Sequence, residues 1–328
     1  MLIDRFGRQV TYLRISVTDR CNLRCVYCMP SDGVTQKTHE QIMRYEEIAQ
    51  IVGVCAANGV RKVRITGGEP LIRKDLPELI AMIHATPGIE DISLTTNGIL
   101  LNGMVEALAS AGLKRINISL DTLEAGKFSR ITRGGSFSRT WEGILAAEAA
   151  GLTPIKLNVV AMRSVNDDEL LAIANLALER GWHVRFIELM PINNQQTWGD
   201  GFPEPSAIYF STNEIFEILK PLQLEPLASA DGCGPAREYQ PRHGEGVIGF
   251  ITPVSEKFCD TCNRLRITAD GNLRPCLLSD IEIPLLPALR AGEPILPILQ
   301  QAIDLKPSGH ELATSNRPLT RCMLQIGG

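Results

Sequence analysis

The chain has 328 residues, 44% hydrophobic and 21% charged, which is enough to bury a sizeable core in one large domain or two modest ones. Intrinsic disorder is therefore excluded as the main state. The net charge is −4, from 33 Lys and Arg against 37 Asp and Glu, whereas a protein that coats nucleic acid needs an excess of cations. A small anionic substrate held by a few cations remains compatible with this charge.

Short β-rich runs alternate with amphipathic helical stretches through the first two thirds of the chain. The runs are Tyr12–Val17, Lys62–Thr66, Asp91–Thr96, Arg115–Leu120, Ile155–Met162 and His183–Met190, and the helical stretches are Glu46–Ala57, Leu76–Ala85, Gly103–Ser110, Ser138–Ala150 and Asp168–Glu179. This alternation predicts an α/β fold with parallel strands joined by right-handed crossovers. Six units are too few for a full eight-fold barrel, so we expect a partial, open (β/α)6 TIM-like barrel, with a doubly wound sheet as the alternative.

The predicted strands alternate apolar and polar side chains, although a parallel sheet covered on both faces should be apolar on both. The polar positions include Arg14, Arg64 and Lys156. If helices cover the apolar face, the polar face lines a hydrated, cationic cavity suited to a phosphorylated ligand.

The regular pattern stops after about Phe210, which predicts domains at 1–210 and 211–328. The stretch from Pro191 to Tyr209 has the composition of a loop, and Ser211–Lys220 that of a short helix. Gly246–Pro253 is a further β-rich run, and Asp270-Gly271 marks a hairpin turn between Leu265–Ala269 and Leu273–Leu277.

No segment approaches about 18 uninterrupted apolar residues, and Met1–Val10 lacks an apolar signal segment, so we expect no membrane partner and a cytoplasmic location. Thiols stay reduced in that compartment. Six of the nine cysteines nevertheless form two tight groups, which favours metal binding or catalysis over disulfides. The five His are scattered, so any metal is held mainly by sulfur.

The first group, Cys21, Cys25 and Cys28, directly follows the first predicted strand, at the rim where barrel active sites assemble. Three cysteines suit a [4Fe–4S] cluster with one open iron, whereas a structural zinc site needs four ligands. Gly67-Gly68-Glu69 follows the second strand at the same rim. Its glycines permit close approach to the backbone, and its carboxylate can accept a hydrogen bond from an ammonium group.

The second group is Cys259, Cys262 and Cys276. Its spacing predicts either a second three-cysteine cluster or a zinc knuckle completed by Cys233 or Cys322. Arg264 and Arg266 lie between the ligands and alternate along a strand, which places both guanidinium groups on one face.

The spacing of the first group and the Gly-Gly-Glu-Pro turn resemble the radical S-adenosylmethionine signature. The segments Asp4–Pro30 and Phe250–Leu278, with the terminal Gly327-Gly328, resemble one family in particular, the GTP 3′,8-cyclases of molybdenum cofactor biosynthesis. The resemblance covers nearly the whole chain. It departs in Asn193–Tyr209, which looks longer than usual, and at Glu238 and Gln240, where an aromatic and a basic residue are commoner.

The resemblance implies two [4Fe–4S] clusters, held by the two cysteine groups, and S-adenosylmethionine. Cleavage of that cofactor would yield a radical that removes hydrogen from the ribose C3′ of GTP, after which C3′ attacks C8 of guanine to give (8S)-3′,8-cyclo-7,8-dihydroguanosine 5′-triphosphate. The implied contacts to S-adenosylmethionine are Tyr27, Gly67, Gly68, Glu69, Ser119 and Met190. The implied contacts to GTP are Arg14, Arg64, Thr95, Lys156, Arg264 and Arg266, and the implied catalytic residues are Arg264, Arg266, Gly327 and Gly328.

The same resemblance implies an electron donor such as flavodoxin or ferredoxin, cyclic pyranopterin monophosphate synthase as the next enzyme, and a monomer or homodimer. Two rival functions are a radical enzyme that modifies peptides and a zinc-stabilised module that binds protein or nucleic acid. The first predicts further cysteines around an auxiliary site, which the C-terminal part lacks, and the second predicts a basic surface, against the observed net charge.

Overall fold

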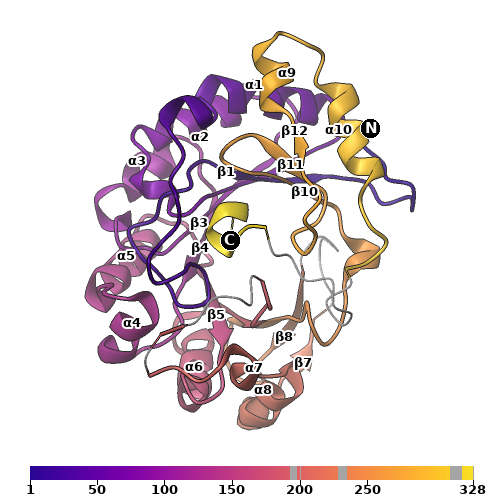
Figure 1. Ribbon diagram of the computed structural model, residues 1–328. Coiled ribbons are helices and arrows are strands. Elements are labelled where there is room, and N and C mark those ends of the chain that lie inside the picture. The colour runs from indigo at the N-terminus through magenta and orange to yellow at the C-terminus, as the bar shows by residue number, and fades with distance from the viewer. Residues whose placement is uncertain (193–197, 200, 228–234, 311–319, 328) are drawn as a thin grey trace.

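The computed structural model describes residues 1–192, 198–199, 201–227, 235–310 and 320–327. Its first six strands form one curved parallel sheet, with the helices on the outside (Figure 1). The strands are β1 (Tyr12–Ser16), β2 (Lys62–Thr66), β3 (Asp91–Thr96), β4 (Arg115–Ser119), β5 (Lys156–Ala161) and β6 (His183–Glu188). Each agrees with a predicted run to within two residues at either end.

The connecting helices are α1 (Tyr45–Ala57), α2 (Leu76–His84), α3 (Val105–Ser110), α4 (Ala125–Thr132), α5 (Phe137–Ala149) and α6 (Leu170–Arg180). Short 3-10 turns add η1 (His39–Gln41), η2 (Pro70–Ile72), η3 (Leu101–Gly103) and η4 (Asp167–Glu169). Five of the six helices match the predicted stretches, and α4 has no counterpart among them. It is a short helix with a mainly polar sequence, so its apolar positions, such as Phe128 and Ile131, gave no clear period.

The C-terminal segment adds the strands β7 (Glu225–Pro226), β8 (Ala236–Gln240), β9 (Val247–Ile251), β10 (Arg264–Ile267), β11 (Asn272–Arg274) and β12 (Ile283–Pro284). Its helices and turns are α7 (Pro205–Ile208), α8 (Thr212–Leu219), η5 (Lys220–Leu222), η6 (Cys259–Thr261), α9 (Leu286–Arg290), α10 (Leu296–Asp304) and η7 (Met323–Ile326). The predicted hairpin is confirmed as β10 and β11, and the predicted short helix as α8. The stretch from Pro191 to Tyr209 contains α7 in addition to loop.

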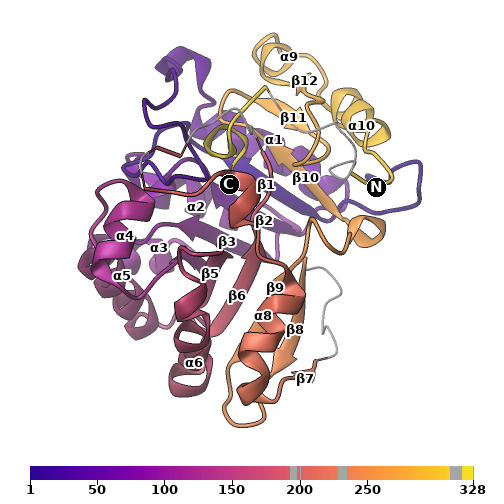
Figure 2. The same cartoon turned by 60° about the horizontal axis from the view of Figure 1, so that its bottom comes forward.

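Strands from both parts of the chain share a single 12-stranded sheet, in the order β12-β11-β10-β1-β2-β3-β4-β5-β6-β9-β8-β7. β10 pairs in parallel with β1 at one edge, and β9 pairs in parallel with β6 at the other. Eight strands therefore run in parallel, but the described sheet does not close. This confirms the prediction of an open, partial barrel (Figure 2). The predicted domain boundary between residues 210 and 211 stays a prediction.

The apolar face of each strand packs on the surrounding helices, as the alternation predicts. Val63, Ile65 and Leu157 are fully buried in one large hydrophobic cluster with helix residues such as Ile48 and Ile80. The opposite face is turned to the inside of the barrel. None of the helices in the described part of the chain is long and apolar enough to cross a membrane.

Candidate active site

A cavity of about 450 Å³ lies inside the curved sheet. It is lined by every predicted site residue except Gly327 and Gly328: Arg14, Cys21, Cys25, Tyr27, Cys28, Arg64, Gly67, Gly68, Glu69, Thr95, Ser119, Lys156, Met190, Cys259, Cys262, Arg264, Arg266 and Cys276. Gly327 lies beside it through a hydrogen bond to Arg14, and Gly328 falls outside the described residues. The fold therefore brings the described members of the set together.

Strand register explains why the cations gather there. Arg14 in β1 is level with Arg64 in β2 and with Arg266 in β10. Residues level with one another on parallel strands point to the same face, so these three guanidinium groups share the cavity wall. In total, nine Lys and Arg residues line the described cavity against five Asp and Glu residues, which suits a polyanion.

The cations of the cavity wall lie close enough to repel one another. Burial and the neighbouring charges of Arg185 and Arg115 lower the pKa of Lys156 to about 8. Burial and Arg64 lower the pKa of Arg185 to about 10, and burial and Arg264 lower that of Arg266 to about 10. A bound anion would reduce the repulsion between these cations and stabilise their charged forms, as water does for an exposed cation.

Several buried polar atoms of the cavity have no hydrogen-bond partner within the described protein. They include Thr95 Oγ1, Asn158 Oδ1, Arg185 Nε and Arg266 Nη1. Buried polar groups are normally paired, so a set of orphans on one wall indicates a polar ligand. Arg185 and Asn158 were missed as candidates, although the alternation of β5 and β6 places both on the polar face.

The first cysteine group occupies a loop braced by its neighbours. Arg133 donates hydrogen bonds to the carbonyl oxygens of Arg24 (3.0 Å) and Met29 (2.8 Å). Asn97 Nδ2 lies 3.9 Å from Cys21 Sγ. Burial raises the pKa of the Cys21 thiol to about 11. Coordination to a metal would displace the thiol proton.

The Gly67-Gly68-Glu69 turn packs tightly on the segment that leads into this loop. A Cβ atom on Gly68 would lie 2.1 Å from the carbonyl oxygen of Arg20, so only glycine fits. The Glu69 side chain accepts hydrogen bonds from Thr96 Oγ1 (2.7 Å) and from the Asn97 backbone N–H (2.7 Å). Burial raises its pKa to about 7. A cationic ligand group would favour the ionised carboxylate.

Tyr27 donates a hydrogen bond to Asp121 Oδ2 at 2.7 Å. The other carboxylate oxygen of Asp121 accepts from the Val160 backbone N–H at 2.8 Å. Burial raises the Asp121 pKa to about 6. Sequence reasoning missed Asp121, but its place directly after β4, at the same rim as the cysteine loop, is a signal that could have found it.

The second cysteine group lies at the opposite end of the parallel strands. Cys262 lies two residues before the start of β10, whereas Cys21 follows the end of β1, and these two strands pair in parallel. β11 returns antiparallel and brings Cys276 to the same end as Cys262. Burial raises the pKa of Cys276; it acts in the same direction on Cys262, but the charges of Lys306 and Arg264 hold that pKa below its ordinary value.

Cys322 packs with Cys21 and Cys28, so it does not complete a zinc knuckle in the second group. Cys233, the other possible fourth ligand, lies outside the described residues. Among the residues that are described, no three Cys, His, Asp or Glu side chains converge to hold a single metal ion. A [4Fe–4S] cluster does not need such convergence, because each thiolate binds a different iron.

The C-terminal turn η7 lies in the middle of the ring of strands (Figure 1, yellow). Leu324 packs with the first cysteine loop, and its N–H donates to the Cys28 carbonyl at 3.4 Å. Ile326 packs in a cluster that includes Cys276. The Gly327 carbonyl accepts from Arg14 Nη2 and from Thr66 Oγ1, each at 3.1 Å. The tail thus contacts both cysteine groups and the cationic wall.

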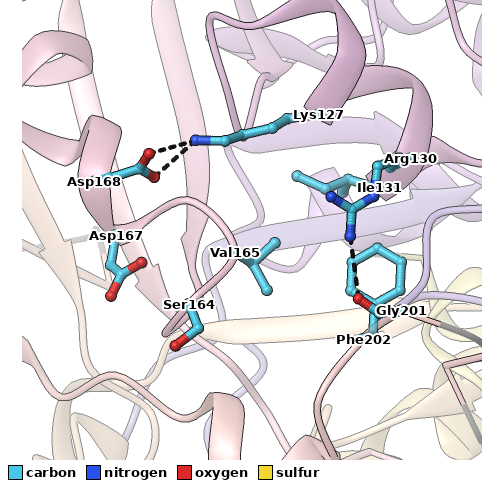
Figure 3. A pocket seen from close by; sticks show the side chains of 9 residues that line it. All are labelled: Lys127, Arg130, Ile131, Ser164, Val165, Asp167, Asp168, Gly201 and Phe202. Atoms are coloured by element: carbon cyan, nitrogen blue, oxygen red, sulfur yellow. Dashed lines mark hydrogen bonds and ion pairs between the residues drawn. The ribbon is translucent and has the colours of Figure 1, made fainter.

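A second cavity, of about 310 Å³, lies between α4 and the segment that follows β5 (Figure 3). Its cations already have partners. Lys127 contacts both carboxylate oxygens of Asp168, and Arg130 donates to the Gly201 carbonyl at 3.1 Å. It therefore lacks the uncompensated charge of the central cavity.

Two family models match the chain: the Radical SAM superfamily over residues 15–177 and Molybdenum Cofactor Synthesis C over residues 182–312. A GTP 3′,8-cyclase from Pelotomaculum thermopropionicum is 49% identical over 99% of both chains. The chain belongs to the GTP 3′,8-cyclase family. The relative of the same name from Listeria monocytogenes is 45% identical over 100% of this chain and 99% of its own. This membership makes the chain a radical enzyme that uses a [4Fe–4S] cluster and S-adenosylmethionine.

Solved structures support the fold of this GTP 3′,8-cyclase family member. The structure of anSMEcpe with bound AdoMet matches with a TM-score of 0.58 and 15% identity over 89% of this chain and 79% of its own. Streptococcus suis SuiB matches with a TM-score of 0.59 and 16% identity over 82% of this chain, which spans only 60% of SuiB. At these identities the likeness concerns the fold alone.

The positions at which the sequence was expected to depart from the family pattern lie partly in the cavity. Glu238 lines the cavity, where its charge partly offsets Lys156 and Arg185. Gln240 instead donates to the Gly244 carbonyl at 2.8 Å and stays in the β8–β9 hairpin. Residues 193–197 and 200 of the unusual loop lie outside the described residues.

Proposed function

We propose that this chain converts GTP into (8S)-3′,8-cyclo-7,8-dihydroguanosine 5′-triphosphate, the first step of molybdenum cofactor biosynthesis. One observation carries the proposal. A single cavity is lined by both cysteine groups and by a strongly cationic wall with orphaned polar atoms. The wall spans a strand of five residues, or about 16 Å, which suits an extended nucleoside triphosphate.

In this proposal, Cys21, Cys25 and Cys28 hold the first [4Fe–4S] cluster, at the carboxyl ends of the strands. When bound there, the cluster and S-adenosylmethionine supply a radical able to remove hydrogen from carbon. Glu69 and the backbone of Gly67-Gly68 orient the amino group of S-adenosylmethionine. Tyr27, Ser119 and Met190 contact the same ligand from the cavity wall.

The cationic wall then orients GTP. Arg14, Arg64 and Lys156 bind the triphosphate and ribose, with Arg185 added from the structure, and Thr95 lies beside the nucleotide. Arg264 and Arg266 hold the guanine near the second cluster, whose proposed ligands are Cys259, Cys262 and Cys276. Positioning of this kind is the protein's main contribution, because C3′ must face the radical while water is kept away.

Electrons are proposed to come from a small acidic carrier such as flavodoxin or ferredoxin. Arg24, exposed beside Cys25 in the first loop, offers such a carrier a cationic contact. A reducing compartment such as the cytoplasm would keep the six ligand thiols available. The product would pass to cyclic pyranopterin monophosphate synthase, and we propose a monomer or homodimer.

The test is formation of product from GTP by the anaerobically reconstituted protein with S-adenosylmethionine and dithionite, followed by mass spectrometry. We expect a product with the mass of GTP after aqueous work-up and a new C3′–C8 bond by NMR, and none from ATP. Cleavage of S-adenosylmethionine without any change in GTP would contradict the proposal.

Replacing Arg64 should weaken the binding of GTP much more than the binding of guanosine, since the lost contact is to phosphate. We expect Arg64→Met to raise the Kd for GTP by about 10- to 100-fold, the value of a charge-assisted hydrogen bond. Isothermal titration calorimetry measures both ligands. Arg61→Met is the matched control, because Arg61 is exposed and pairs with Glu90. Equal losses for GTP and guanosine would assign Arg64 a structural role instead.

GTP affinity should also fall between pH 7 and pH 9. Burial and the neighbouring cations lower the Lys156 pKa to about 8, so its ammonium is mostly charged at pH 7 and mostly neutral at pH 9. Because the triphosphate binds the charged form, the Kd should rise about tenfold over this range. Lys156→Arg should flatten the profile, since arginine remains charged. The same steep profile in Lys156→Arg would rule Lys156 out as its source.

A further inference from the structure

Lys306 is a buried cation to which neither the sequence pattern nor the proposed substrate contacts assign a role. It follows α10 and is 3% exposed. Its Nζ donates to Cys262 Sγ (3.4 Å), to the Arg264 carbonyl (2.8 Å) and to the Pro275 carbonyl (2.9 Å). All three hydrogens of the ammonium group are therefore used.

Within the described ranges, no carboxylate forms an ion pair with this ammonium group. Burying an uncompensated charge is costly, and buried cations are normally paired or bound to anions. Cys262 Sγ accepts one of its hydrogen bonds, and the Cys276 thiol lies close enough for the ammonium charge to act on it. Thiolates bound to iron would supply the missing negative charge.

The acceptors of Lys306 belong to two separate segments. Arg264 lies two residues after Cys262 at the start of β10, and Pro275 directly precedes Cys276 after β11. A single ammonium group thus ties together the backbones that carry two of the three ligands. Its hydrogen bonds to the two backbone carbonyls link the Cys259-x-x-Cys262 loop to the segment that carries Cys276.

Arg8 holds the same region from outside and provides a comparison. It donates to the Cys259 carbonyl at 2.7 Å and to the Pro307 carbonyl at 2.6 Å. Its charge is already balanced by Asp4, whose carboxylate lies 2.6 Å from Arg8 Nε. Arg8 therefore braces the loop as a cation paired with a carboxylate, whereas Lys306 directs at the sulfur a charge that no carboxylate of the described residues balances.

We propose that Lys306 is a positioning residue for the second iron–sulfur cluster, which holds the Cys262 and Cys276 segments together and favours the more reduced cluster by its positive charge. The inference rests on the second cluster of the proposed function. A nearby cation stabilises the more negative, reduced state, so its removal lowers the reduction potential.

The experiment compares reconstituted wild type, Lys306→Met, Lys306→Arg and Arg8→Met. Iron and acid-labile sulfide are measured, followed by potentiometric titration of both clusters by electron paramagnetic resonance. The wild-type protein is measured first. If its iron and sulfide content corresponds to only one cluster, the second cluster of the proposed function is itself wrong. With two clusters in wild type, we expect a negative shift of the second midpoint in Lys306→Met, with the first midpoint unchanged. In Lys306→Arg the second midpoint potential should lie close to the wild-type value, because the positive charge is retained. In Arg8→Met the second midpoint potential should not change.

Wild-type potentials in Lys306→Met, or an equal shift in Arg8→Met, would overturn the proposal. If Lys306→Met loses the second cluster altogether, the iron content of Lys306→Arg decides whether the charge or the packing of Lys306 is required. Iron regained in the arginine variant supports a requirement for the cation. Iron absent from both variants, with the first cluster intact, would mean that packing rather than charge matters, and would also overturn the proposal.

Discussion

Cys25→Ser should abolish cleavage of S-adenosylmethionine and lower the iron content by about half, the share of one of two [4Fe–4S] clusters. The thiol lines the cavity with Cys21 and Cys28, in a loop that Arg133 ties down from outside. A serine hydroxyl is a poor iron ligand, and two cysteines alone leave the cluster incompletely held. The measurements are iron content and 5′-deoxyadenosine released in the presence of dithionite.

Cys55→Ser is the matched control, because Cys55 is a buried thiol of α1 in the hydrophobic core. It should keep full iron content and full cleavage. Retained cleavage of S-adenosylmethionine in Cys25→Ser would show that the first cluster is held elsewhere. It would contradict the proposal that the Cys21–Cys28 loop binds this cluster.

Deleting Gly327 and Gly328 should lower formation of the cyclised product by about 100-fold, while both clusters and S-adenosylmethionine binding persist. The Gly327 carbonyl accepts hydrogen bonds from Arg14 and Thr66, so the deletion releases a cation of the proposed triphosphate site from its position. Misplacement by about 1 Å in an active site can cost that much in rate. The residues that dock the tail, Leu324 and Ile326, remain in place.

The measurements are iron content, binding of S-adenosylmethionine and product formation on the shortened chain. Gly103→Ala is the control, since an added methyl group there meets nothing within 4 Å. Product at the full-length rate would show that the tail has no part in the reaction. Loss of iron would assign it a structural role instead.

The alternation of β1, β2 and β5 was sufficient to predict both the helical cover and the cationic cavity wall. In each of these short strands a cation (Arg14, Arg64 or Lys156) stands between two buried apolar residues, so local pattern and tertiary environment agree. The same logic applied to β6 would have found Arg185, whose neighbours Val184 and Phe186 are buried on the opposite face.

Other features depend on contacts between distant segments and have no local pattern. The parallel pairing of β9 with β6 and of β10 with β1 extends the sheet across more than 50 residues of intervening chain in each case. Lys306 follows a short amphipathic helix, where a lysine is ordinarily an exposed residue at the helix end. Only the folded chain brings it against Cys262. The need for glycine at position 68 likewise arises from the Arg20 carbonyl, 48 residues earlier.

The central claim is that this chain directs hydrogen abstraction to C3′ of GTP, and the most direct measurement uses GTP deuterated at that carbon. The reconstituted protein is incubated with this substrate, S-adenosylmethionine and dithionite, and the 5′-deoxyadenosine is analysed by mass spectrometry. We predict that it carries one deuterium from the substrate, in amounts equal to the cyclised product. Unlabelled 5′-deoxyadenosine formed in the presence of bound, deuterated GTP would contradict the assignment.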